Sequence, residues 1–222
     1  MARPKKGYQN NEEKRVAGVT SVLNWYGDKG GIIYAANKLG LEGKTIRDEW
    51  YTKAANTGTL GHDFFEQYLH KQLDMEPIEI DLDSYTITEI TGAETARDSA
   101  IRWFENTHLE IIWTEMPLVS EKMQIGGTPD ALGVDAQGNY VIADWKTGGV
   151  YGSALFQVAA YKILVEENLP DVEIKGFHVV RFAKDTGDFV HRYYPELDKQ
   201  VEAYPQMVKL FRLMQETEKR AK

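Results

Sequence analysis

The chain has 222 residues and carries 34 acidic against 26 basic side chains, which gives a net charge of −8. A chain of this length buries about 70% of the surface that its unfolded form exposes, so it can build a core without disulfides or a structural metal. The absence of cysteine excludes disulfides, thiolate zinc sites, iron–sulfur clusters and cysteine nucleophiles, and the negative charge argues against a protein that coats nucleic acid non-specifically.

The N-terminal half is expected to be mainly helical. Residues 1–15 read as a flexible basic arm and residues 16–222 as one domain. No apolar run approaches the roughly 18 residues of a membrane helix, and the basic N-terminus lacks the apolar stretch of a signal peptide, so we expect a cytoplasmic protein. Apolar spacing and capping residues predict helices over 16–25, 32–39 (ended by Gly40), 46–55, 62–73 and 93–106.

The second half mixes strands and helices. A β-rich stretch over 110–119 is followed by predicted strands at 123–134, 140–147, 172–182 and 188–194. A helix over 153–167 lies between the second and third of these strands, and a last helix covers 196–222, interrupted at Pro205. This order predicts one α/β domain with a mixed central sheet flanked by helices. The apolar face of the last helix is expected to pack on its own domain, with a homo-oligomer contact as the alternative.

A short hairpin brings two carboxylates together. A three-residue loop over 136–138 pairs Asp135 with Asn139, and the antiparallel register then places Asp130 opposite Asp144. Alternation along the strand puts Asp144 and Lys146 on one face. Adjacent carboxylates repel each other unless a cation lies between them, and their oxygens suit Mg²⁺ or Mn²⁺. Lys146 could offset negative charge that develops during phosphodiester hydrolysis, although an ordinary salt bridge at a strand end is the simpler explanation of Asp-x-Lys alone.

Two features beyond the hairpin favour the catalytic interpretation. Gln157 and Tyr161 lie one turn apart on one face of the helix that follows. The connection into that helix contains three glycines, which would allow a substrate backbone to come close.

The ordered set of motifs resembles the PD-(D/E)xK nuclease superfamily. The superfamily motif is present as Pro129-Asp130 followed by Asp144-Trp145-Lys146. Gln157-x-x-x-Tyr161 makes the chain similar to the RecB-type exonuclease branch, which includes CRISPR-adaptation nucleases and phage exonucleases. His62, preceded by Gly58-Thr59, matches the histidine that this branch carries on a helix upstream of the sheet. The resemblance covers residues 16–195 and implies a restriction-endonuclease-like core with an N-terminal helical layer that supplies His62.

The resemblance also implies roles for individual residues. Metal ligands would be His62, Asp130, Asp144 and the backbone carbonyl of Trp145. Lys146 would be the catalytic lysine, and Gln157 and Tyr161 would position the lysine or the DNA. Several members of the branch hold an iron–sulfur cluster with four cysteines, and this chain, which has none, belongs with the cluster-free members.

Other polar residues allow alternatives. Glu66, one helical turn after His62, is a further candidate metal ligand, and His62, Glu66 and His70 together could form a separate zinc site, although a solvated helix face explains His70 equally well. Glu115 and Glu121 could approach the metal, but solvation at a strand edge is the favoured interpretation of both.

These inferences predict a nuclease. The expected activity is that of a Mg²⁺- or Mn²⁺-dependent DNA exonuclease in recombination, repair or phage DNA processing, located in the bacterial or phage-infected cytosol. Its partners would be DNA ends or single strands and a recombination protein. Candidate DNA contacts are Tyr151, Arg181 and Lys122. The alternatives are a structure-specific or nicking endonuclease and a non-catalytic subunit that binds DNA ends.

Overall fold

The computed structural model describes residue 4 and residues 7–27, 30–47 and 55–221. The helices in these ranges are α1 (Val19–Tyr26), α2 (Gly30–Leu41), α3 (Ala55–Gln72), α4 (Ile87–Thr107), α5 (Ser153–Asn168) and α6 (Asp198–Arg220). The strands are β1 (Ala17–Gly18), β2 (Glu110–Thr114), β3 (Leu118–Ser120), β4 (Ile125–Gly127), β5 (Ala131–Val134), β6 (Tyr140–Lys146), β7 (Ile174–Phe182) and β8 (Phe189–Tyr194). Among the described helices, none combines the length and the apolar character that crossing a membrane requires.

The central sheet is mixed, as the sequence predicts. Its strand order is β2-β5-β6-β7-β8, with β6 and β7 parallel and every other neighbouring pair antiparallel. The β5–β6 hairpin has the register expected from its short loop, because Ala131 pairs with Ala143 and Val134 with Tyr140. Asp130 and Asp144 therefore follow at the open end of this hairpin, on neighbouring strands.

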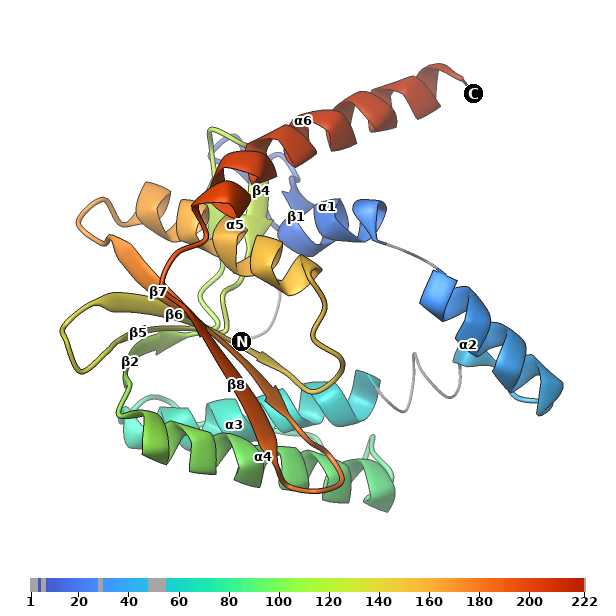
Figure 1. Cartoon of the computed structure of the whole chain (residues 1–222), viewed down its shortest axis with the longest axis vertical. Coiled ribbons are helices and arrows are strands. Elements are labelled where there is room, and N and C mark those ends of the chain that lie inside the picture. Colours follow the sequence, from blue (N-terminus) through green and yellow to red (C-terminus); the bar gives the residue numbers. More distant parts are fainter. Residues whose placement is uncertain (1–3, 5–6, 28–29, 48–54, 222) are drawn as a thin grey trace.

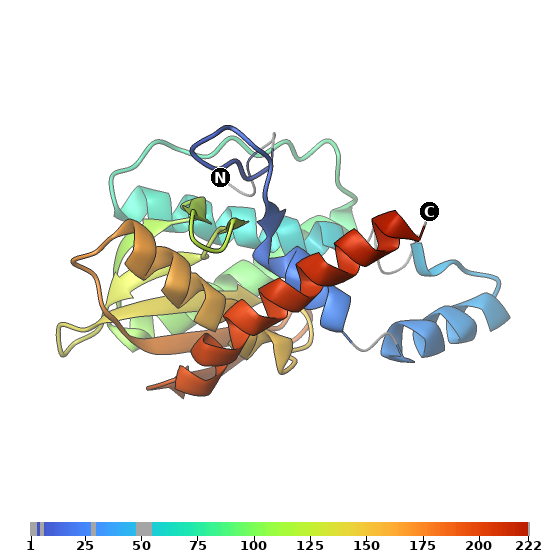
Figure 2. The same cartoon turned by 90° about the horizontal axis from the view of Figure 1, so that it is seen from above.

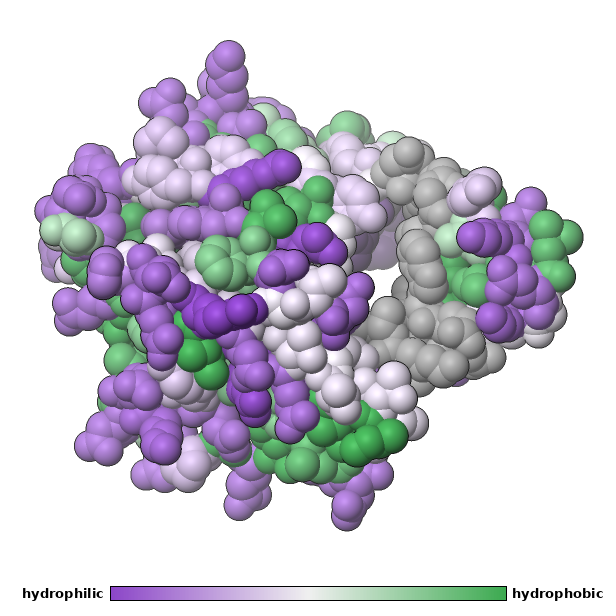
Figure 3. Space-filling model, turned by 60° about the horizontal axis from the view of Figure 1, so that its bottom comes forward, coloured by the Kyte–Doolittle hydropathy of each residue, from purple (hydrophilic) through white to green (hydrophobic). Residues whose placement is uncertain are grey.

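Helices cover both faces of the sheet, with α3 and α4 on one side and α5 and α6 on the other (Figure 1). The side chains of β6 alternate between two cores. Ile142 packs in the core that contains α1, α5 and α6, whereas Val141, Ala143 and Trp145 pack against α3 and α4. Both faces of β6 are thus covered, which explains why its sequence is apolar at nearly every position. Seen from the side of α4 and β8, hydrophilic residues cover most of the surface (Figure 3).

Several predicted boundaries differ from the structure. The stretch 123–134 is not one strand, because β4 and β5 lie in different sheets; β4 joins β1 and β3 in a separate three-stranded sheet. Gly40 lies inside α2, and the glycine with left-handed backbone after this helix is Gly43. Most of the helix predicted over 46–55 falls outside the described residues. Pro205 does not interrupt α6, because the burial of Tyr204 and Val208 on either side offsets the hydrogen bond that proline removes.

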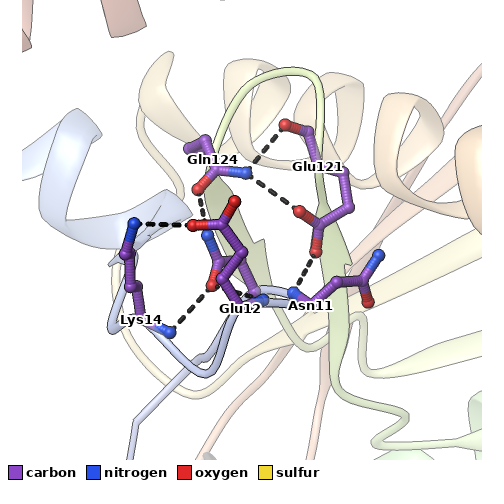
Figure 4. Close-up of polar contacts among 6 residues, drawn as sticks. Asn11, Glu12, Lys14, Glu121 and Gln124 are labelled. Atoms are coloured by element: carbon purple, nitrogen blue, oxygen red, sulfur yellow. Dashed lines mark hydrogen bonds and ion pairs between the residues drawn. The ribbon is translucent and has the colours of Figure 1, made fainter.

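The described part of the N-terminal arm is docked on the domain, in contrast to the free arm that its composition suggests. Tyr8 is buried and its hydroxyl forms a hydrogen bond of 3.0 Å with the Thr128 hydroxyl. The Glu121 carboxylate accepts a hydrogen bond from the backbone N–H of Asn11, and the Gln124 amide reaches the same arm (Figure 4). Figure 2 shows the arm folded over the edge of the molecule, whereas α2 lies beside the main body.

Candidate active site

The end of β6 carries a buried ion pair. Asp144 is fully buried, and Lys146 Nζ lies 2.5 Å from its Oδ2. Apart from this ion pair, neither oxygen of Asp144 has a hydrogen-bond partner among the described residues. A fully buried carboxylate balanced by one ammonium group is costly to bury, and a further cation or a proton would offset that cost.

Asp130 lies at the matching end of β5 and is held by the backbone of β6. Its Oδ2 accepts a hydrogen bond of 2.7 Å from the Trp145 N–H. The N–H and C=O of one strand residue point to the same side of the strand, so the Trp145 carbonyl is directed toward the edge at which Asp130 lies.

Two residues from outside the hairpin meet Asp130. One ligand atom each from His62, Glu115 and Asp130 lie within 4.8 Å of one another, a group that could hold a metal ion. His62 comes from α3, which can approach β6 closely because Gly58 has no side chain; a Cβ there would lie 2.7 Å from Thr147 Oγ1.

Glu115, which the sequence predicts to be a solvated residue at a strand edge, lies in this group instead. It directly follows β2 in a left-handed conformation with φ of 47°, and its N–H donates to the Asp130 carbonyl at 3.1 Å. This bend turns Glu115 toward the site. Glu121, by contrast, contacts Gln124 and Asn11, which belongs to the N-terminal arm.

The electrostatics of the cluster reflect burial of acidic groups. Burial raises the pKa of Asp144 to about 6, against the opposing effect of the Lys146 charge, and raises the pKa of Asp130 to about 6 as well. Burial and the charge of Asp130 raise the pKa of Glu115 to about 9. Burial, followed by repulsion from Lys146, lowers the pKa of His62 to about 4, which keeps the imidazole neutral near pH 7. Burial lowers the pKa of Lys146, but the carboxylates of Asp144 and Asp130 raise it more, so the amine stays protonated.

This donor set fits a divalent cation. It combines carboxylates that repel one another, a neutral imidazole and the buried Asp144, whose charge is balanced by Lys146. Oxygen ligands suit Mg²⁺, and the addition of one imidazole favours Mn²⁺.

The lysine is connected to α5 by a chain of hydrogen bonds. Lys146 Nζ donates to Gln157 Oε1 at 3.2 Å, and Gln157 Nε2 donates to the Tyr161 hydroxyl at 2.8 Å. Tyr161 is itself buried. The chain therefore fixes the ammonium group from α5.

The remaining candidates lie at different distances from this centre. Glu66 is buried one turn after His62 and pairs with His70 at 3.5 Å, but the described three-residue metal cluster contains Glu115 in place of both. Arg181 pairs with Lys146 across the parallel strands β6 and β7, and Tyr151 is exposed in the glycine-rich connection. The backbone N–H of Lys122 bonds to Glu167, near the C-terminal end of α5, so this lysine lies away from the site.

Comparison with known proteins gives a family assignment. The model of the PD-(D/E)XK nuclease superfamily matches residues 34–219. No curated protein matches the sequence significantly. Among solved structures, LHK-Exo in complex with dAMP is similar with a TM-score of 0.44 and 12% identity, over 71% of this chain and 87% of that one.

Two further structures are similar at comparable levels. An alkaline exonuclease (LHK-Exo) from Laribacter hongkongensis has a TM-score of 0.40 and 15% identity, over 70% of this chain and 79% of that one. A putative exonuclease from Eubacterium rectale has a TM-score of 0.43 and 16% identity, over 69% of this chain and 64% of that one. The family model covers most of the chain, including every residue of the cluster described above. The chain belongs to the PD-(D/E)XK nuclease superfamily.

Proposed function

We propose that the protein is a divalent-metal-dependent DNA exonuclease of the RecB-type branch, with Mg²⁺ or Mn²⁺ held by His62, Glu115, Asp130 and Asp144. The observation that carries the proposal is that three side-chain features meet at the end of β6. These are the His62–Glu115–Asp130 group, the fully buried carboxylate of Asp144 and the charged Lys146 with which it is paired. The Trp145 carbonyl, directed to the same edge, is a further candidate ligand.

The chemistry assigned to the chain is hydrolysis of a phosphodiester bond. A bound divalent cation would polarise the phosphate and lower the pKa of a water molecule. The Lys146 ammonium would offset the charge that develops on the phosphate oxygens as water attacks. Gln157 and Tyr161 would keep Lys146 in place, and Asp144, 2.5 Å from Nζ, would preserve its charge.

The choice of an exonuclease rests on the likeness of the Gln157–Tyr161 helix and His62 to the RecB-type branch. The test uses purified protein with Mg²⁺, Mn²⁺ or EDTA on end-labelled linear DNA and on covalently closed circular DNA. An exonuclease degrades the linear DNA progressively and leaves the circle intact. Cutting of the circle would identify the endonuclease alternative.

A matched pair of variants controls for contamination. Asp144→Asn keeps the shape of the side chain but removes its charge, and should abolish cleavage. Glu121→Gln makes the same change on an acidic residue that contacts the N-terminal arm, and should cut like the wild type. Metal-dependent binding to DNA ends without turnover would instead identify a non-catalytic subunit.

A further inference from the structure

A small pocket lies beside the candidate active site, on the face of the sheet that carries Asp144 and Lys146. Its volume is about 250 Å³, and its lining consists of Gly149, Val150, Val179, Arg181, Val190 and Arg192. The lining thus combines an apolar floor of valines with two guanidinium groups, and no acidic residue lines it. This composition is unusual on a chain with a net charge of −8.

Sheet register fixes where the two arginines lie relative to Lys146. Lys146 pairs with Arg181 on β7, and Val179, two residues earlier, pairs with Arg192 on β8. Paired residues share a face, and Val179 packs in the same core as Ile142, so both arginines project on the α5 side. Neighbouring strands are about 4.8 Å apart, which places Arg181 one strand and Arg192 two strands from the catalytic lysine.

The two guanidinium groups are available to a ligand. Both side chains are exposed, and neither forms an ion pair or a hydrogen bond with another described residue. Arg181 and Arg192 are diagonal neighbours across the β7–β8 pair, a spacing that long side chains can bridge. One phosphate group between them would receive hydrogen bonds from both, the arrangement for which guanidinium groups are suited.

An aromatic ring stands at the rim of the same pocket. Tyr151 is 72% exposed, and its hydroxyl lies 2.8 Å from the place that a Cβ on Gly149 would occupy. Because Gly149 lines the pocket, the Tyr151 ring lies next to one of its lining residues. Exposed tyrosines of this kind stack on unpaired bases in proteins that bind single strands.

We propose that this pocket binds one unpaired nucleotide of the substrate strand, next to the bond that is cut. The phosphate of the nucleotide lies between Arg181 and Arg192, and its base covers the valine floor beside Tyr151. The volume is slightly below the roughly 300 Å³ at which pockets for drug-sized ligands begin, so the pocket suits one nucleotide better than several. A base held in a pocket cannot pair, so the inference specifies a substrate that is single-stranded at this position. It rests on the proposed function, because it adds a binding subsite to the same centre.

The test separates the pocket from the catalytic centre by using two substrates. Arg181→Gln and Arg192→Gln are compared with Arg220→Gln, which removes an exposed arginine at the far end of α6. On a single-stranded oligonucleotide, we expect the pocket variants to raise KM by about tenfold or more while Arg220→Gln leaves it unchanged. On a small chromogenic phosphodiester, which reaches the metal without filling the pocket, the two pocket variants should lose several-fold less activity than on the oligonucleotide, and Arg220→Gln should keep the wild-type rate.

Binding gives a readout that does not need turnover. Fluorescence anisotropy of a labelled single-stranded oligonucleotide in EDTA should show weaker binding to both pocket variants than to Arg220→Gln. Val190→Phe fills the pocket from a half-exposed position without changing charge, and should weaken single-strand binding while duplex binding stays the same. Unchanged anisotropy in the arginine variants, or a silent Val190→Phe, would overturn the proposal. Loss of turnover on the small diester in wild type, with the binding differences intact, would overturn the proposed function and leave the pocket standing.

Discussion

The side-chain oxygen of Gln157 accepts a hydrogen bond of 3.2 Å from Lys146 Nζ, the same ammonium group that lies 2.5 Å from Asp144. A lysine side chain has a flexible four-carbon stem, and two contacts at its ammonium group restrict where its charge can lie. Gln157 is in turn fixed by the hydroxyl of the buried Tyr161. Helix α5 thus fixes the position of the ammonium group of Lys146, the last residue of β6.

The first prediction concerns this chain of hydrogen bonds. We expect Gln157→Ala and Tyr161→Phe to lower kcat by about tenfold or more, because a small displacement of a charged group costs much of its effect on the reaction. The free energy of unfolding should change by only about 1 kcal/mol, the net value of one hydrogen bond. Turnover of DNA and thermal unfolding of the same preparations measure both quantities. If Tyr161→Phe has wild-type kcat, the hydroxyl does not hold the site.

The second prediction concerns Glu115. Glu115→Gln should weaken the binding of Mn²⁺ by about tenfold or more, because glutamine cannot lose a proton to the solvent and become a charged ligand beside His62 and Asp130 when the metal binds. Glu121→Gln is the matched control, since Glu121 contacts Asn11 instead. Isothermal titration of Mn²⁺ into the two variants compares them directly. Equal affinities would remove Glu115 from the metal site and restore its interpretation as a solvated strand-edge residue.

The two glutamates also mark how far the sequence could predict the site. The positions of Asp130 and Asp144 were predictable, because a short loop fixes the hairpin register and Ala131 does pair with Ala143. The position of Glu115 depends on a left-handed residue after β2, and a bulge in that strand shifts its register. Nothing in the residue types around Glu115 specifies such a bend, so the sequence predicts a solvated residue at a strand edge.

The N-terminal region shows a second limit of the same kind. A polar arm of this composition predicts a free segment, yet Tyr8 is buried. Its ring fits over Gly126, where a Cβ would come within 2.5 Å of three Tyr8 atoms. The contact joins residues 118 positions apart, and Gly126 allows it because it has no side chain. The local sequence pattern therefore predicts the central sheet, whereas the docking of the N-terminal arm depends on a long-range contact that the local pattern does not reveal.

The third prediction concerns pH and the metal-free protein. The pKa of Asp144 is raised from 3.8 to about 6 in the folded state, so the folded protein binds a proton more tightly than the unfolded chain. This contribution to stability is fully present below pH 3.8 and is lost as the pH rises through about 6. In EDTA, the Tm of Asp144→Asn relative to wild type should therefore increase as the pH is raised from about 4 to about 7.

Bound metal should cancel this difference in Tm between Asp144→Asn and the wild type. Saturating Mn²⁺ stabilises a wild-type protein that binds it, and should remove the advantage of Asp144→Asn at pH 7. Thermal unfolding at several pH values, with and without Mn²⁺, measures the effect. If the Tm difference between the two proteins is the same at every pH, the pKa of Asp144 is not raised in the folded protein.

The fourth prediction concerns Gly127, where the small sheet meets α5. A Cβ at this position would lie 2.7 Å from Leu164 Cδ1 and 2.9 Å from Tyr161 Cε1. Both neighbours are buried, so Gly127→Ala must push α5 outward or rotate the Tyr161 ring. We expect a loss of about 1–3 kcal/mol in the free energy of unfolding, the usual cost of overpacking a core. Because Tyr161 fixes Gln157, the same substitution should lower kcat on DNA.

Gly40→Ala is the control. This glycine lies inside α2 with open space where its Cβ would be, and alanine favours a helix, so the stability of this variant should equal or exceed that of the wild type. Chemical denaturation and turnover of the two variants decide the matter, and a Gly127→Ala protein as stable and as active as wild type would contradict the close approach of β4 to Tyr161.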